Sequence, residues 1–263
     1  MMLLKSPPDV KSFFIVFYAG RSFKSRIIMP MVEETTKFPE LTVVIPALNE
    51  GSTIETIITG CLRYTDDVVV VDGHSRDDTV RVATARGARI VMDNRRGKGE
   101  AIRCVISHLR RPITVFIDAD GSHDPDDIPA LIAPIREGKA DHVSGSRLIG
   151  GSSELHGGFD ECFRLMGSSL ITACVNHRFG VQLSESQNGF RAIRTEVLRD
   201  LGLVEDITTI EQEMIIKTLK KGYRMGEVPS HEHKRKGGVS KISLRKVAVR
   251  YVWTMVKYLY LTK

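Results

Sequence analysis

Two aspartates separated by one residue, Asp118 and Asp120, directly follow the apolar run 113–117. If that run is a buried strand, both carboxylates leave its end on the same side, about 7 Å apart. Hard divalent cations take oxygen ligands of this kind, and Mg²⁺ often shares them with a phosphate. The pair therefore predicts a cation site next to a bound phosphate, with a solvated strand end as the plain alternative.

The segments around this pair alternate between strand and helix patterns. Continuous apolar runs predict strands at 41–45, 68–71, 89–92 and 113–117, and the stretches between them predict helices at 53–63, 77–86 and 99–109. This alternation indicates an α/β fold, Rossmann-like, with a mostly parallel sheet flanked by helices. Ligands of such sheets bind at the carboxyl ends of the strands. Polar clusters follow three of these strands: Pro46, Asn49 and Glu50; Asp72 and Ser75; Asp118 and Asp120.

Composition and charge set wider limits. The chain has 263 residues, with 42% apolar and 27% charged content, which is ordinary for a globular protein. Its four cysteines form no C-x-x-C pair, which suits a reducing cytosol. The net charge is +6, but residues 217–263 hold 13 Lys and Arg against Glu227 and Glu232. A basic C-terminal segment attracts a polyanion, which leaves nucleic acid, an anionic membrane or substrate phosphates as candidates.

Three parts of the chain differ in pattern. Residues 1–40 read as a leader that is disordered or weakly membrane-associated, or that results from a start site upstream of a true start at Met29 or Met31. Residues 41–243 form the predicted α/β domain. Residues 244–263 are predicted as a basic amphipathic helix at a membrane interface, because apolar residues recur at helical spacing beside Lys and Arg, with aromatic residues near the end.

Eight short motifs occur in the order found in one known family. They are P-A-L-N-E at 46–50, V-V-D-G-H-S-R-D-D-T at 70–79, G-K-G-E-A at 97–101, D-A-D at 118–120, G-S-R at 145–147, N-G-F-R at 188–191, Glu213 in E-Q-E-M, and R-K-G-G-V-S-K at 235–241. On these residues the chain resembles a family 2 glycosyltransferase with a GT-A fold, over about 41–243. The downstream motifs resemble the dolichyl-phosphate-mannose synthase group, in an archaeal-type branch.

The resemblance implies a donor site for a nucleoside-diphosphate sugar. Asp118 and Asp120, with Ala119 between them, would hold or face Mg²⁺ or Mn²⁺, which stabilises the leaving diphosphate. Asp72 would accept hydrogen bonds from the base or ribose, and Pro46, Asn49 and Glu50 would line the same end of the pocket. Lys98 would contact phosphate or the base, although G-K-G is also a plain loop. Ser122 and His123 depart from the family pattern, and their role stays open.

The resemblance also implies residues on the acceptor side. Arg147 is the candidate for an acceptor phosphate, and Arg191 matches a second family position. Arg235 and Lys241 would close over the diphosphate, with a solvated basic loop as the alternative. Glu213 is predicted to orient the sugar or an arginine, and for a hydroxyl acceptor Glu211 or Glu213 would act as base. Glu185 is expected to be structural.

The C-terminal helix predicted at 244–261 has its apolar stripe at Leu244, Val247, Ala248, Tyr251, Val252, Met255 and Leu259. This stripe suits a membrane interface, with packing on the protein body or on another subunit as the alternative. Residues 163–175 are a second interfacial helix or part of the core. Neither segment has the roughly 18 apolar residues that a spanning helix needs.

The resemblance implies an inverting transferase that passes a sugar from GDP-mannose, UDP-glucose or UDP-N-acetylglucosamine to dolichyl or polyprenyl phosphate, for surface glycan or N-glycan assembly. The protein is then expected on the cytoplasmic face of the membrane as a peripheral enzyme, with an oligomer or a membrane partner as an option. A soluble family 2 enzyme with a hydroxyl acceptor is the alternative. A nucleic-acid-binding module is a third interpretation, which the helical spacing of the aromatic residues disfavours.

Overall fold

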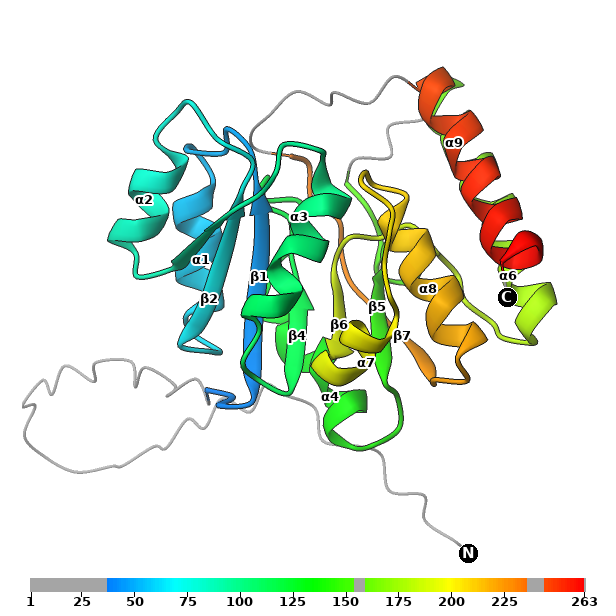
Figure 1. Ribbon diagram of the computed structural model, residues 1–263, viewed down its shortest axis with the longest axis horizontal. Coiled ribbons are helices and arrows are strands. Elements are labelled where there is room, and N and C mark those ends of the chain that lie inside the picture. The colour runs from blue at the N-terminus through cyan, green and yellow to red at the C-terminus, as the bar shows by residue number, and fades with distance from the viewer. Residues whose placement is uncertain (1–36, 154–158, 236–243, 263) are drawn as a thin grey trace, which may run out of the picture. The chain divides into compact units, whose positions relative to one another are not determined.

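The computed structural model describes residues 37–153, 159–235 and 244–262, and the side chains of 159–164 and 244–248 lie outside that description. A mixed sheet of seven strands forms the centre of this part of the chain, in the order β3-β2-β1-β4-β6-β5-β7 (Figure 1). All neighbouring pairs are parallel except those of β6, which is antiparallel to β4 and β5. The strands are β1 (Leu41–Ala47), β2 (Asp67–Asp72), β3 (Arg89–Met92), β4 (Ile113–Phe116), β5 (His142–Ser146), β6 (Arg191–Arg194) and β7 (Met225–Pro229).

Helices connect these strands and lie on both faces of the sheet (Figure 1). They are α1 (Ile54–Cys61), α2 (Thr79–Ala85), α3 (Lys98–Val105), α4 (Ile128–Arg136), α5 (Arg147–Gly150), α6 (Phe159–Phe179), α7 (Thr195–Asp200), α8 (Ile210–Lys220) and α9 (Leu244–Val256), which continues as a π-helical turn (Lys257–Leu261). The first four strands and three helices agree with the predicted ranges to within a few residues. The mostly parallel α/β fold is therefore confirmed.

The apolar strand runs are continuous because both faces of the sheet are covered. Successive side chains of a strand point to opposite faces, so Val43 and Ile45 enter one core cluster while Val44 enters the other. The first cluster includes residues of α1 and α4, and the second includes residues of α3, α7 and α8. This two-sided core fixes the strand ends, and with them the polar residues that follow each strand.

A third apolar cluster joins the C-terminal helix to the rest of the fold. α9 and its π-helical turn pack on α8 and α6, where Tyr258 and Leu259 are buried with Val175 and Ile215 (Figure 1). Much of the apolar stripe predicted for the membrane thus faces the protein body, since Leu259 is buried and Tyr251 and Met255 are half-buried.

Val252 departs from that stripe and is exposed. It lies on an outward face of α9 together with Val249 and Trp253. The segment 163–175 falls within α6, which has the same two-sided character, with Ile171 buried and Met166 and Leu170 exposed.

Candidate active site

Polar residues gather at the carboxyl edge of the sheet, where β1, β2 and β4 end side by side. Their register places Ala47 beside Asp72, so the loops after these two strands begin at the same level. A pocket of about 780 Å³ opens at this edge, with walls from the loops after β1, β2 and β3. Its lining residues include Pro46, Asn49, Gly73, His74, Arg76, Asp93, Arg95, Arg96 and Lys98. Pro46, Asn49 and Lys98 are predicted site residues, and the arginines after β3 were not identified from the sequence.

Asp72 holds the loop after β2, which lines this pocket. The residue is fully buried, and its two carboxylate oxygens accept hydrogen bonds from the Ser75 hydroxyl and backbone N–H, at 2.6 and 2.9 Å. Asn49 extends the same turn: its backbone N–H donates to the Ser75 hydroxyl at 2.8 Å, and its side-chain oxygen accepts from the backbone N–H of Arg76 at 2.8 Å. Asp72 therefore holds the loop that lines the pocket, and its direct contact with a base or ribose stays a prediction.

Lys98 joins two acidic residues at the bottom of the site. Its ammonium lies 2.6 Å from Oδ1 of Asp118 and 2.7 Å from Oε1 of Glu211. Burial would lower the pKa of Lys98, but the two carboxylates outweigh it and the pKa is raised. Burial would likewise raise the pKa of Asp118, but Lys98 and then His123 outweigh it, so the pKa of Asp118 is lowered. Lys98 and Asp118 therefore stay charged at neutral pH.

Gly189 presses against this trio and was not singled out from the sequence except as part of N-G-F-R. A methyl group at this position would lie 2.7 Å from Oδ2 of Asp118, 2.7 Å from Nζ of Lys98 and 3.2 Å from Oε1 of Glu211. A Cβ atom this close would push the ends of these charged side chains aside, so glycine allows the backbone to approach the trio.

Asp120 has a different set of partners. Its Oδ1 accepts hydrogen bonds from the Ser122 hydroxyl at 2.6 Å and backbone N–H at 3.0 Å, and its Oδ2 lies 3.3 Å from Nε of Arg235. Ser122 is thus a support for the second aspartate, which answers the question left open by the sequence. Glu50 lies close enough that burial first, and the charge of Asp120 second, raise the pKa of its carboxyl. Ala119 is buried between the two aspartates.

The donor atoms at this edge fit a hard divalent cation that brings its own phosphate ligands. Within the described ranges no three His, Cys, Asp or Glu side chains are grouped to hold a metal ion by themselves. Mg²⁺ rarely uses such a cage, because it binds through one or two carboxylates and completes its shell with water and substrate phosphates. His123 is a further polar residue near this edge. Its ring is stacked on Phe190, and its buried Nδ1 has no hydrogen-bond partner among the described residues. The predicted pair, Asp118 and Asp120, can supply the two carboxylates.

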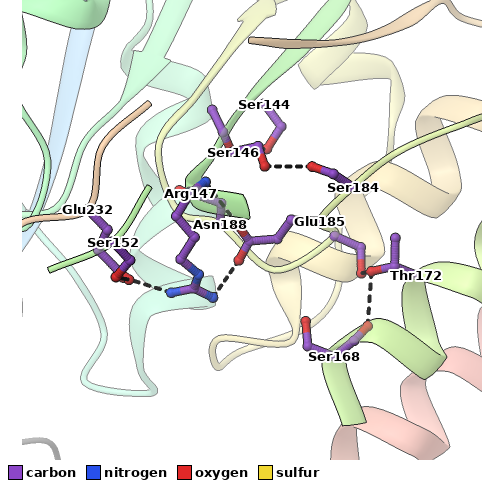
Figure 2. A network of polar contacts seen from close by, with 12 residues as sticks. Ser144, Ser146, Arg147, Ser152, Ser168, Thr172, Ser184, Glu185, Asn188 and Glu232 are labelled. Carbon is purple, nitrogen blue, oxygen red and sulfur yellow. Dashed lines mark hydrogen bonds and ion pairs between the residues drawn. The ribbon is translucent and has the colours of Figure 1, made fainter. Parts of the chain in front are cut away.

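Arg147 lies on the other side of the site, at the start of α5, and is enclosed by acidic groups (Figure 2). Nη1 is 2.7 Å from Oε1 of Glu232, and Nη2 forms an ion pair with Glu185. Burial would lower the pKa of Arg147, but the two carboxylates outweigh it and raise the pKa. Glu185 is almost completely buried and fixes this arginine, which agrees with the structural role expected for it.

Two predicted residues point away from the pocket. Arg191 is 1% exposed, and its guanidinium donates to the backbone carbonyls of Glu211 and Asn188, so it braces the N-G-F-R turn. Glu213 is fully buried and accepts hydrogen bonds from the backbone N–H groups of Val204 and Glu205.

The role assigned to Glu213 is therefore corrected. Residues two apart on a helix point to nearly opposite sides, so Glu211 reaches the site while Glu213 anchors a loop. Lys241, the other predicted lid residue, lies outside the described residues.

The carboxylates at the strand ends, the pocket beside them and the mostly parallel sheet define an α/β protein whose candidate site lies at the carboxyl edge of its sheet. Residues 42–202 match glycosyl transferase family 2, so the chain belongs to that family and is a glycosyltransferase. The dolichyl-phosphate hexose transferase of Haloferax volcanii is 31% identical over 203 residues, which cover 76% of this chain and 86% of that protein. Glycosyltransferase AglJ of the same organism is 30% identical over 201 residues, 74% of this chain and 64% of that protein.

Solved structures support the fold. Glucosyl-3-phosphoglycerate synthase from Mycobacterium tuberculosis, in complex with Mn²⁺ and UDP-glucose, superposes with a TM-score of 0.69 and 23% identity over 86% of this chain and 80% of that one. The same enzyme in complex with Mg²⁺ and UDP gives a TM-score of 0.68. The predicted GT-A fold is thus confirmed.

Proposed function

We propose that the protein transfers a hexose from a nucleoside-diphosphate sugar to dolichyl or another polyprenyl phosphate, with inversion at the anomeric carbon. The observation that carries this proposal is the carboxylate pair Asp118 and Asp120, flanked by Lys98 and Arg235, beside the pocket at the strand ends. The similarity to a dolichyl-phosphate hexose transferase supports the acceptor.

The donor side has two kinds of residue: carboxylates that would bind a cation and basic residues that would bind phosphate. Asp118 and Asp120 would hold Mg²⁺ or Mn²⁺, which when bound acts as a Lewis acid on the leaving diphosphate. Lys98 and Arg235 add positive charge at the same edge. Arg95 and Arg96 line the pocket beyond them and are placed to meet phosphate or base.

The acceptor side needs no strong base if the acceptor is a phosphate. A phosphate monoester is already ionised at neutral pH, so its oxygen attacks the anomeric carbon directly while the enzyme holds two anions together. Arginine suits this task because its planar fork matches phosphate oxygens. We assign the acceptor phosphate to Arg147.

The two outer helices provide a surface for a lipid acceptor. Val249, Val252 and Trp253 of α9 are 73%, 49% and 57% exposed, and Met166 and Leu170 of the adjacent α6 are 59% and 65% exposed. Residues 244–263 contain Lys and Arg but neither Asp nor Glu. This combination of apolar side chains and positive charge fits the anionic face of a membrane. Among the described helices none is long and apolar enough to cross a bilayer, so we propose peripheral contact, on the cytoplasmic face.

A hydroxyl acceptor is the second candidate, and one observation favours it. Glu211 lies at the bottom of the site with its carboxylate 2.7 Å from Lys98. A carboxylate at this position can take the proton of an attacking hydroxyl. In that case Glu211→Gln would abolish transfer while leaving donor binding intact, whereas a phosphate acceptor would tolerate the loss of that proton acceptor.

A transfer assay decides between the two. Radiolabelled GDP-mannose, UDP-glucose and UDP-N-acetylglucosamine are each incubated with the enzyme, Mg²⁺ and dolichyl phosphate, and label is followed into the lipid phase. We expect label in the lipid from one donor, with Glu211→Gln keeping at least a tenth of the wild-type rate. No lipid label from any donor, together with transfer to a soluble hydroxyl acceptor, would refute the lipid acceptor.

A further inference from the structure

The proposed acceptor arginine is already paired with two carboxylates (Figure 2). Arg147 contacts Glu232 through Nη1 and Glu185 through Nη2. Ser152 donates a hydrogen bond to the second oxygen of Glu232 at 2.9 Å. One guanidinium with two carboxylates carries a charge of −1 as a group. An incoming phosphate therefore meets a negative cluster, which repels it unless one carboxylate leaves the arginine.

The two carboxylates are attached to the protein in different ways. Glu185 is 1% exposed, its backbone N–H donates to the Glu227 carboxylate at 3.0 Å, and its own carboxylate faces the backbone N–H of Arg147. Glu185 is therefore fixed beneath the arginine. Glu232 approaches from the side, on residues 230–235, which follow β7 and which we name the counter-ion segment.

The counter-ion segment holds the backbone of Glu232 independently of its side chain. The Glu232 N–H donates to the Gly151 carbonyl at 3.0 Å, and the Glu232 carbonyl accepts from Ser153 N–H at 2.7 Å. A methyl group on Gly150 would lie 2.4 Å from the Ser230 backbone, so the two chains are in close contact. Because these bonds use only the main chain, they hold the segment whether or not the Glu232 side chain, which is itself buried at 6% exposure, contacts Arg147.

The same segment reaches the donor side. The N–H of His233 donates to the Ser122 carbonyl at 2.8 Å, and Nε of Arg235 lies 3.3 Å from Oδ2 of Asp120. The carboxylate on Arg147 thus lies three residues along the chain from a cation that contacts the D-A-D motif. Glu232 therefore lies on the segment that connects the proposed acceptor arginine with the donor side.

We propose that Glu232 is a specificity-determining residue of the acceptor side: an internal counter-ion that the acceptor phosphate displaces from Arg147. The proposal rests on the proposed function in assigning Arg147 to the acceptor. A phosphate dianion replaces one carboxylate charge with two and makes two or more hydrogen bonds to the guanidinium. A neutral hydroxyl or a monoanion gains less from the same exchange. Glu232 thereby sets a threshold, and a phosphate monoester gains enough from the exchange to displace it.

The first test measures phosphate binding alone, without lipid or donor. Inorganic phosphate is titrated into the full-length protein by calorimetry for the wild type, Glu232→Gln and Glu232→Gln combined with Arg147→Gln. Removing one negative charge near a bound dianion is worth about a five- to tenfold gain in affinity. We expect that gain in Glu232→Gln and its loss when Arg147 is also replaced.

The second test measures transfer to dolichyl phosphate with the active donor and Mg²⁺. For Glu232→Gln we expect the KM for dolichyl phosphate to fall about five- to tenfold, since the same Coulomb term is removed, while the KM for the donor stays within twofold. Glu196→Gln is the matched control, because it removes the same charge from an exposed position on α7, and it should leave both constants unchanged. Ser152→Ala, which removes one bond to Glu232, should tighten phosphate binding about twofold and serves if Glu232→Gln does not fold.

The outcomes are separable. If the wild type labels no lipid, the proposed function fails, but the phosphate titration still decides the role of Glu232. If phosphate affinity is unchanged or weaker in a folded Glu232→Gln, or in Ser152→Ala, Glu232 is a structural support and the inference is overturned. A gain that persists without Arg147 also overturns it, since the effect would then not act through that arginine.

Discussion

The donor half and the acceptor half of the site treat charge in different ways. On the donor side, residues of the loops after β1, β2 and β3 border an open pocket. At its edge Asp118 forms an ion pair with Lys98, and Asp120 forms one with Arg235. On the acceptor side, Arg147 is almost enclosed and bound by two carboxylates. In our proposal the donor half receives its ligand directly, whereas the acceptor half exchanges a protein partner for its ligand.

The two halves differ because the chain brings their residues together in different ways. Parallel strands bring their carboxyl ends to one edge, so the donor residues meet as a consequence of the topology. The acceptor residues come from the start of α5, the segment before β6 and the segment after β7, which the pairing of β5 with β6 and β7 brings together. We make four predictions that test this difference and the fold around it, beginning with the largest expected effect.

Removing the second aspartate should have the largest effect. In Asp120→Asn the charge that would face the cation is lost while the hydrogen bonds to Ser122 can remain, so we expect kcat to fall about 10²- to 10³-fold. The melting temperature should stay within a few degrees. Asp78→Asn, which removes an exposed carboxylate paired with Arg81, is the control and should keep full activity. Wild-type turnover by Asp120→Asn under limiting Mg²⁺ would contradict the role of the pair.

Adding one methyl group at Gly189 should disrupt the trio of Lys98, Asp118 and Glu211. Because that methyl would lie within 3 Å of two charged atoms, the carboxylate of Asp118 must move, and a displacement of this size near reacting groups costs about 10- to 100-fold in kcat/KM. Gly167→Ala is the matched control, since a methyl there meets no atom within 4 Å. Equal kcat/KM for both alanine variants would show that the trio tolerates displacement.

The outward face of α9 can be tested with the natural probe that the chain contains. Trp253 is the single tryptophan and is 57% exposed, so its emission should shift to shorter wavelength on vesicles rich in anionic lipid and not on neutral ones. Val249→Asp should weaken vesicle binding about fivefold, because it places a negative charge in the apolar contact. Thr84→Asp on α2 adds the same charge elsewhere and should bind like the wild type. Unchanged emission on anionic vesicles would remove this face as the membrane contact.

The smallest effect concerns the pH dependence of stability through His142. This residue is fully buried on β5, its Nδ1 bonds to the Thr218 hydroxyl at 2.9 Å, and burial first and the charge of Arg191 second lower its pKa well below the usual value. The unfolded chain takes up a proton below about pH 6.5 and the native state does not. The contribution of His142 is therefore present above that pH and is lost as the pH falls, by up to about 1.4 kcal/mol per pH unit.

Chemical denaturation between pH 7 and pH 5 checks this directly. His142→Asn should give a flatter dependence of the free energy of unfolding on pH than the wild type. His108→Asn, at an exposed position, is the control and should keep the wild-type slope. The same slope in both variants would mean that His142 does not control acid stability.

The donor side could be predicted from the sequence because each of its residues follows a recognisable strand. Pro46, Asn49, Asp118 and Asp120 were placed by counting from apolar runs whose ends the structure confirms. The arginines after β3 were missed, since Arg95 and Arg96 stand in a loop whose direction no periodic pattern gives.

The contacts of the acceptor side could not be predicted because they join residues that are far apart in the sequence. The partner of Arg147 is Glu232, 85 residues away, and only the pairing of β5 with β7 brings them together. Helical geometry allows one of Glu211 and Glu213 to face the site, but the sequence does not say which. The stripe on α9 was assigned to a membrane because its buried partner, α8, has no sequence signal that marks it as a neighbour.

In the proposed function, Asp118 and Asp120 hold a cation through which the protein binds the diphosphate of its donor. Calorimetric titration of UDP and GDP into the wild type and Asp120→Asn, each with and without Mg²⁺, tests it most directly. We predict that one nucleotide binds the wild type at least tenfold more tightly with Mg²⁺ and that Asp120→Asn loses this gain. If each nucleotide binds both proteins equally well with and without Mg²⁺, Asp118 and Asp120 do not hold such a cation.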